Sequence, residues 1–159
     1  MRDEIVVHQD DPRVTVIELV GEHDGYSARK IGASIDAALA EERDVVVDLG
    51  RATFLDSTVI SQLLVAQRAA TKLPIGFAIV LGSTTGWPVR TVFEVAHLQE
   101  VFPVAPTLDA ALERLGNDGP DRRRSGERRS GADRRRGFTA SPIGERRVAE
   151  RRSGADRRR

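Results

Sequence analysis

Apolar and polar positions alternate along residues 5–115 with the periods that are typical of strands and helices. Five short runs of β-branched or continuously apolar residues predict strands, and the third and fourth runs predict the buried centre of a sheet. These strands cover residues 5–8, 14–20, 44–49, 75–81 and 101–104. Apolar residues at helical spacing predict four helices. The helices cover residues 26–43, 57–72, 91–98 and 107–115.

The resulting element order is ββαβαβαβα, with long crossovers between most of the strands. This order predicts an α/β fold in which helices cover a mixed sheet. The pattern leaves open whether helices cover both faces of the sheet or only one. Gln9 to Pro12 is expected to form the hairpin turn between the first two strands, and Thr107 is expected to cap the last helix.

The periodic pattern ends near Gly116. Residues 117–120 are turn formers, and beyond them the only large apolar side chains are Phe138, Ile143 and Val148. These are too few to offset the entropy cost of ordering a packed core. We therefore predict a folded domain at 1–116 and a disordered tail at 117–159.

The formal net charge of +1 conceals two oppositely charged segments. Residues 121–159 hold fifteen arginines against six acidic residues, which gives this segment a net charge of +9 and the rest of the chain −8. The unit ERRSGADRRR stands at 127–136 and again at 150–159. Such a tail could remain a solvated extension, fold back on the acidic domain or bind an acidic partner, or contact nucleic acid or an anionic membrane. The interleaved acidic residues weaken the nucleic-acid interpretation.

Composition also excludes several kinds of site. The chain has no cysteine, and its three histidines lack ligand-like spacing, so neither a disulfide nor a metal site is expected. Its glycines match neither a phosphate-binding loop nor a dinucleotide fingerprint, so we expect no cofactor. The longest apolar run, residues 75–81, is far too short to cross a bilayer, and the N-terminus does not resemble a signal peptide. We therefore expect a cytoplasmic protein.

The candidate chemistry lies in residues 45–60, where a buried strand is followed by a short loop and then a helix. Asp56 is suited to be the N-cap of that helix, which places Ser57 near unpaired amides and the positive end of the helix dipole. The residues alone leave two interpretations open. The segment is either an ordinary helix start, or it presents a hydroxyl whose phosphorylation would change an acidic surface. No histidine stands in position to act as a base for Ser57, so hydrolase chemistry has little support.

Four segments of the chain resemble one known family. FLDSTV at 54–59 resembles the signature of the STAS domain, the fold of bacterial anti-sigma factor antagonists, and GEHD at 21–24 resembles the end of that family's second strand. Residues 92–98 and 101–111 resemble its C-terminal helix, edge strand and closing helix. The resemblance runs in order from about residue 4 to residue 115 and does not extend to the tail.

The resemblance implies that Ser57 is the phosphoacceptor, with Thr58 as the second choice. In this family the dephosphorylated antagonist binds an anti-sigma factor that is also a serine kinase, and the sigma factor is released. Phosphorylation breaks the pairing, and a phosphatase restores it. We therefore expect a regulator of transcription rather than an enzyme. Its partner-binding surface is expected to include Asp24, Asp56, Ser57, Thr58 and Val59.

Two residues depart from the family pattern. Val59 stands where the family commonly has glycine, and it is expected to limit the close approach of a partner's backbone. His23 replaces an aliphatic residue and is expected to lie partly exposed at the end of a strand.

Other features leave alternatives open. The hydroxyls of residues 83–85 are expected to cap the following helix, and Trp87 either closes the edge of the core or forms an exposed contact patch. A second interpretation of the resemblance is a STAS subunit of a lipid-transport or sensory complex. A third is a nucleic-acid-associated protein whose binding is driven by the tail.

Overall fold

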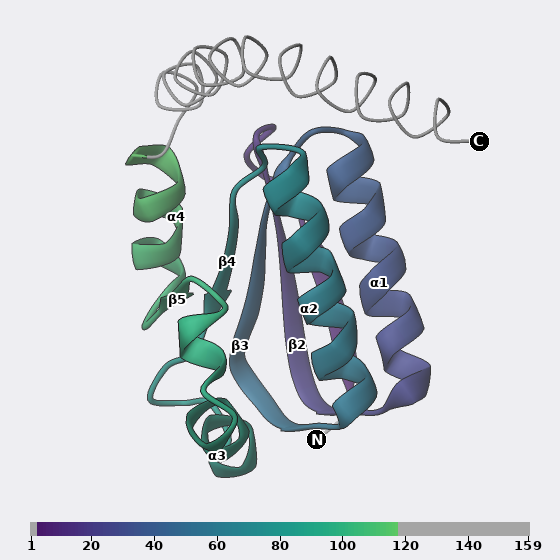
Figure 1. The fold of residues 1–159 in the computed structure, drawn as a ribbon, viewed down its shortest axis with the longest axis vertical. Coiled ribbons are helices and arrows are strands. Elements are labelled where there is room, and N and C mark those ends of the chain that lie inside the picture. The colour runs from purple at the N-terminus through teal and green to yellow at the C-terminus, as the bar shows by residue number, and fades with distance from the viewer. Residues whose placement is uncertain (1–2, 118–159) are drawn as a thin grey trace, which may run out of the picture. The chain divides into compact units, whose positions relative to one another are not determined.

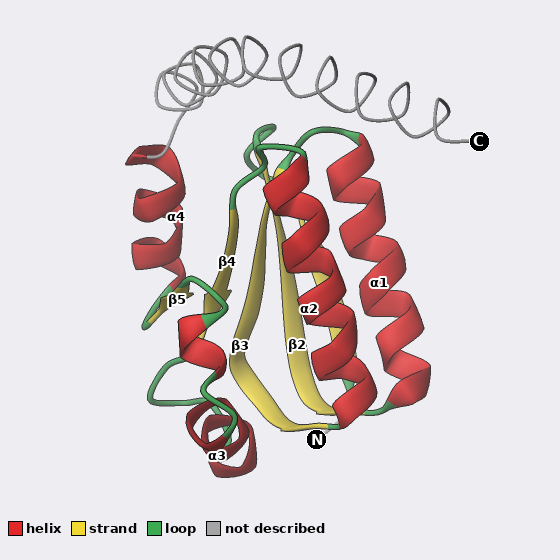
Figure 2. Cartoon of the chain, viewed as in Figure 1, coloured by secondary structure: helices red, strands yellow, loops and turns green. Residues whose placement is uncertain are grey.

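The computed structural model describes residues 3–117, which form strands and helices in the predicted order (Figure 1, Figure 2). The strands are β1 (Glu4–His8), β2 (Val14–His23), β3 (Asp44–Leu55), β4 (Phe77–Val80) and β5 (Val104–Ala105). The helices are α1 (Gly25–Ala40), α2 (Ser57–Lys72), α3 (Trp87–Val95) and α4 (Leu108–Asn117), with a short 3-10 helix, η1, at Leu98–Glu100. The arginine-rich repeats and the functions considered for them lie outside the described residues.

The strands form one mixed sheet, as predicted, and the structure adds their order in the sheet, β1-β2-β3-β4-β5. β1 pairs with β2 in antiparallel orientation, and every later neighbour pair is parallel. A helix connects each parallel pair, because parallel strands need a crossover. The carboxyl ends of β2, β3 and β4 therefore meet at one edge of the sheet, which we call the carboxyl edge.

Helices cover both faces of the sheet, which answers the question that the sequence left open. Val45 and Val47 of β3 lie in the core cluster that includes Ile35 of α1 and Leu63 of α2. Val46, between them in sequence, lies in a second cluster with residues of α4. The alternation follows from the two-residue period of a strand. In Figure 1, α1 and α2 lie side by side in front of the sheet.

The strand β3 extends six residues beyond its predicted end at Leu49, so the loop expected before Asp56 is part of a strand. Its extra length pairs with β2, which itself continues to His23. Register shifts interrupt this pairing, and one of them follows Gly21. Gly21 has a φ of 82°, a left-handed conformation that glycine adopts without steric cost. The expected loop was wrong because backbone pairing with β2 outweighs the loss of the apolar pattern.

The helix α3 begins at Trp87, four residues before its predicted start. Pro88 lies in the first turn, where its missing amide hydrogen costs no intrahelical bond. The expected hydroxyl cap is absent: the N-cap is Gly86, and the Thr85 hydroxyl instead accepts a bond from the Gly82 amide at 3.0 Å. A Cβ on Gly86 would lie 2.7 Å from the Cα of Thr53, so only glycine allows this close approach to β3.

The last strand and helix differ less from expectation. β5 spans only Val104–Ala105, and residues 101–103, which were expected to be strand, form a turn that follows the 3-10 helix η1. The predicted cap on α4 is confirmed, since the Thr107 hydroxyl accepts from the Ala110 amide at 3.1 Å.

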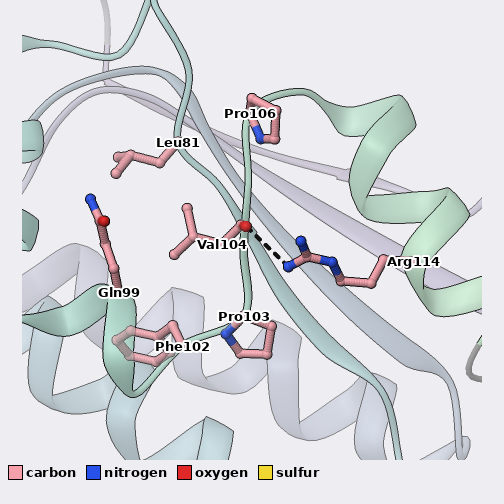
Figure 3. A pocket seen from close by; sticks show the side chains of 7 residues that line it. All are labelled: Leu81, Gln99, Phe102, Pro103, Val104, Pro106 and Arg114. Atoms are coloured by element: carbon pink, nitrogen blue, oxygen red, sulfur yellow. Dashed lines mark hydrogen bonds between the residues drawn. The ribbon is translucent and has the colours of Figure 1, made fainter.

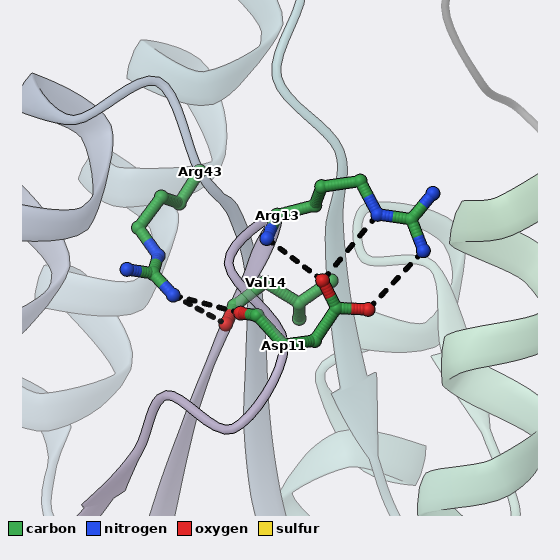
Figure 4. Close-up of polar contacts among 4 residues, drawn as sticks. All are labelled: Asp11, Arg13, Val14 and Arg43. Carbon is green, nitrogen blue, oxygen red and sulfur yellow. Dashed lines mark hydrogen bonds and ion pairs between the residues drawn. The ribbon is translucent and has the colours of Figure 1, made fainter.

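At the end of the sheet opposite the carboxyl edge, the turn between β1 and β2 is held by two arginines (Figure 4). The Asp11 carboxylate accepts bonds from the backbone and side chain of Arg13, and these bonds lower the pKa of Asp11. Arg43, which follows α1, donates to the carbonyls of Asp11 and Val14 at 2.7 and 3.4 Å. These contacts tie the hairpin to the connection between α1 and β3.

Candidate functional site

Two of the predicted site residues, Asp24 and Asp56, occupy equivalent positions on neighbouring strands of the carboxyl edge. Asp24 follows β2 and is the N-cap of α1, and Asp56 follows β3 and is the N-cap of α2. Because β2 and β3 are parallel neighbours, both helices start at the same edge, at the lower end of the view in Figure 1. The sequence predicted one of these caps, that of Asp56; the other follows from the same residue type in the same position.

The Asp56 carboxylate is the most connected group of the site. Its Oδ1 accepts from the amides of Thr58 and Val59 at 2.9 and 3.1 Å, and the Thr58 hydroxyl also donates to it. The Gly25 amide, at the start of α1, is near enough to the same carboxylate to help lower its pKa. The bond from the Thr58 hydroxyl, together with these amides, lowers the pKa of Asp56. Asp56 is therefore held as an anion at the start of α2, next to the start of α1.

Further contacts hold the two helix starts together. Asp24 accepts from the amides of Tyr26 and Ser27 at 3.0 and 3.2 Å, and the Asp56 amide donates to the His23 carbonyl at 3.1 Å. A Cβ on Gly25 would lie 3.3 Å from the Thr58 hydroxyl oxygen, so the first turns of α1 and α2 nearly touch.

Ser57 and Thr58 are both exposed, but their hydroxyl groups differ in their bonding. The Thr58 hydroxyl is engaged by Asp56, whereas among the described residues nothing forms a hydrogen bond with the Ser57 hydroxyl. Ser57 thus presents an unengaged hydroxyl at the start of α2, and the geometry favours it over Thr58 as an acceptor of a transferred group.

Val59, expected on the partner-binding surface, is fully buried and packs in the core beneath α2. Its side chain cannot contact a partner or hinder a partner's backbone, and the sequence expectation was wrong on this point. The spacing of Val59 from the other buried residues of α2, Leu63, Ala66 and Ala70, is the helical spacing of a core face.

His23 was expected to be partly exposed, and this too was wrong, because only 1% of the residue is exposed. Its Nε2 lies 3.0 Å from the Val20 carbonyl, and its Nδ1 is buried without a hydrogen-bond partner. Burial lowers the pKa of His23, although the Val20 carbonyl and the carboxylates of Asp3 and Asp24 act in the opposite direction. The neutral ring therefore fills the position that an aliphatic side chain would fill.

This burial predicts a loss of stability in mild acid. The unfolded chain binds a proton at His23 near the ordinary pKa of about 6.5, and the folded chain binds it only at lower pH. The free energy of unfolding should therefore fall as pH drops below about 6.5, until the folded protein also takes up the proton. Urea denaturation of the wild type and of His23→Leu between pH 7.5 and 5 measures this. The variant should show the shallower decline, and equal slopes would contradict the prediction.

Sequence reasoning missed three exposed side chains at the carboxyl edge. Glu22, at the end of β2, adds a third carboxylate beside Asp24 and Asp56. Tyr26 and Phe54 are 71% and 45% exposed. The sequence carries no signal that the two aromatic side chains are exposed, because aromatic residues in amphipathic elements are ordinarily expected to be buried.

A separate pocket of about 440 Å³ lies beside the edge strand β5 (Figure 3). Its lining includes Gln99, Phe102 and Arg114, and the Arg114 side chain donates to the Val104 carbonyl at 3.1 Å. None of the predicted site residues lines it.

Within residues 3–117, no group of three or more potential ligand side chains could hold a metal ion. None of the helices in this part of the chain combines the length and the apolar character that a membrane span needs.

Comparison with known proteins agrees with this architecture. Among solved structures, an anti-sigma factor antagonist from Mycobacterium paratuberculosis is 29% identical, with a TM-score of 0.62 over 72% of this chain and 94% of that one. The unphosphorylated form of the anti-sigma factor antagonist SpoIIAA is 21% identical, with a TM-score of 0.56 over 70% of this chain and 97% of that one. The phosphorylated form of the Bacillus cell fate determinant SpoIIAA is 23% identical, with a TM-score of 0.55 over 70% and 99%.

No curated protein matches the chain. The model of one protein family, the STAS domain, matches residues 5–111, which include nearly every described strand and helix and the whole of the Asp24–Asp56 site. Both the sequence match and the fold place the domain in one family, and the chain belongs to the STAS domain family.

Proposed function

We propose that this protein is an anti-sigma factor antagonist that acts in the cytoplasm. It binds an anti-sigma factor with serine kinase activity, and phosphorylation of Ser57 by that kinase ends the binding. A phosphatase returns the protein to its binding form. The observation that carries the proposal is the exposed, unengaged hydroxyl of Ser57 at the start of α2, beside the Asp56 carboxylate.

The electrostatics of the carboxyl edge support a switch of this kind. A phosphate on Ser57 would add a charge of about −1.5 to −2. The nearest amides of α1 and α2 already donate to Asp24 and Asp56, so they offer the phosphate few free donors. The phosphate would stand beside two carboxylates rather than being neutralised within the domain. A partner that fits the unmodified edge would then meet a much more negative surface.

The same arrangement supports a binding protein rather than an enzyme. The one carboxylate bonded at the start of α2, Asp56, is held as an anion by its donors and accepts from Thr58 rather than from Ser57. Activation of a serine for nucleophilic catalysis needs a base within reach of its own hydroxyl. Ser57 is better suited to receive a phosphate from a kinase that supplies the base.

Phosphosite mapping tests the proposal. The full chain is incubated with ATP and each anti-sigma factor kinase of the source organism, and the modified residues are identified by mass spectrometry. We expect phosphate on Ser57, its loss in Ser57→Ala and its retention in Thr58→Val. Phosphate on neither Ser57 nor Thr58 with any of these kinases would contradict the switch.

A further inference from the structure

The aromatic side chains of the described residues fall into two groups of three. Phe77, Phe93 and Phe102 are buried and pack together, with ring centroids 6.2 and 6.0 Å apart in the two contacting pairs. Tyr26, Phe54 and Trp87 are exposed, by 71%, 45% and 73%. We call these three residues the aromatic row.

All three members of the aromatic row belong to the carboxyl edge. Tyr26 lies in the first turn of the helix that follows β2, Phe54 near the end of β3, and Trp87 at the start of the helix that follows β4. Since β2, β3 and β4 are consecutive neighbours in the sheet, the row follows the edge from strand to strand. Ser57 belongs to the central connection, that of β3, so the row extends to both sides of it.

One contact positions the backbone next to Trp87, and another restrains the ring of Tyr26. The Gly86 amide donates to the Ala52 carbonyl at 2.8 Å, which fixes the start of α3, and thus Trp87, against β3. Lys30 Nζ lies 4.8 Å from the centre of the Tyr26 ring and so restrains one face of it. Large aromatic side chains that are exposed and yet positioned by the backbone are typical anchors of protein interfaces.

The charge of the edge indicates what covers the row. Exposed Glu22 and Asp24, together with Asp56, make the centre of the carboxyl edge acidic. The exposed cations Lys30 and Arg90 stand near its two ends, next to Tyr26 and Trp87. A second copy that docked through the same edge would bring these carboxylates against their own kind, and nucleic acid would also be repelled. A basic protein surface with apolar pockets fits both the charge and the aromatic side chains.

We propose that Tyr26, Phe54 and Trp87 are the anchors through which this chain binds a basic, apolar-pocketed protein surface, with Ser57 between them. The inference rests on the proposed function, because it takes that partner to be the anti-sigma factor kinase. Binding strength then comes mainly from aromatic burial on both sides of Ser57, and the phosphate acts at the centre of the interface.

Binding measurements with full-length variants test the row. The dissociation constant for the anti-sigma factor kinases of the source organism is measured by calorimetry for Tyr26→Ala, Trp87→Ala and Ser57→Asp. The controls are Val65→Ala and Leu73→Ala, which remove apolar side chains that are 60% and 51% exposed elsewhere on or next to α2. We expect each aromatic variant to weaken binding about tenfold or more, with unchanged thermal stability, and the controls to bind as the wild type does.

The outcomes separate this inference from the phosphorylation switch. If Ser57→Asp loses binding while both aromatic variants bind like the wild type, the row is not an interface and the switch stands. If the aromatic variants lose binding and Ser57→Asp does not, the aromatic row is a binding interface and the proposed switch at Ser57 is wrong. If the wild type binds none of the kinases, both are overturned.

Discussion

Replacement of Ser57 by Asp should weaken binding to the anti-sigma factor kinase about 30- to 100-fold, whereas Ser57→Ala should bind nearly as well as the wild type. The hydroxyl makes no bond to the described part of the chain, so its removal disturbs no contact within the domain. The aspartate, in contrast, adds a charge beside Asp56, where a like charge in an interface costs on the order of 2–3 kcal/mol. Titration calorimetry with the purified partner measures both affinities.

A matched control separates a local effect from the effect of net charge. Thr71→Asp adds the same charge to an exposed position in the last turn of α2, at the opposite end from Ser57. It should leave the affinity unchanged at moderate salt, because charges beyond a Debye length of roughly 8–10 Å are largely screened. Equal affinities for Ser57→Asp and Ser57→Ala would rule out the switch.

The largest loss of stability should come from Phe93→Ala, at about 3–5 kcal/mol. Phe93 on α3 is fully buried and packs against Phe102, with ring centroids 6.0 Å apart. Its removal leaves a cavity beneath α3 that the close contact between Gly86 and β3 prevents the helix from closing. Urea denaturation at pH 7 measures the change in the free energy of unfolding.

Phe54→Ala is the matched control for this substitution. It removes the same side chain from a position that is 45% exposed, and should cost about 1 kcal/mol or less. A similar loss in the two variants would show that the core beneath α3 collapses around the missing ring.

The sequence predicts the α/β architecture, the element order and both ends of α2 correctly, because local signals agree there. Asp56 is a strong N-cap, and the helical spacing of Leu63 and its neighbours continues without interruption to Lys72. The end of β3 could not be predicted in the same way. Gly50 and Arg51 break the apolar pattern, and only pairing with β2 keeps the chain extended through them.

The errors in the site have a related cause. Polar residue types predict exposure, yet His23 is buried because its place at the end of β2, between the core and the start of α1, leaves it no access to water. Val59 was assigned to the partner-binding surface because it lies in the FLDSTV motif, although its helical spacing from Leu63 indicates a core position. For Tyr26, exposure depends on how the Asp24 cap turns the first residues of α1, which no local pattern encodes.

The order of the strands in the sheet has a consequence for how the domain forms. Each strand after β1 pairs with the strand that precedes it in the chain, so during synthesis a partner for it has already left the ribosome. The sheet can grow outward from the β1–β2 hairpin without waiting for distant sequence. The face covered by α4 is the exception, because Val46 and its neighbours stay open until residues 108–117 have been made. The described domain should therefore reach its full free energy of unfolding only when α4 is complete.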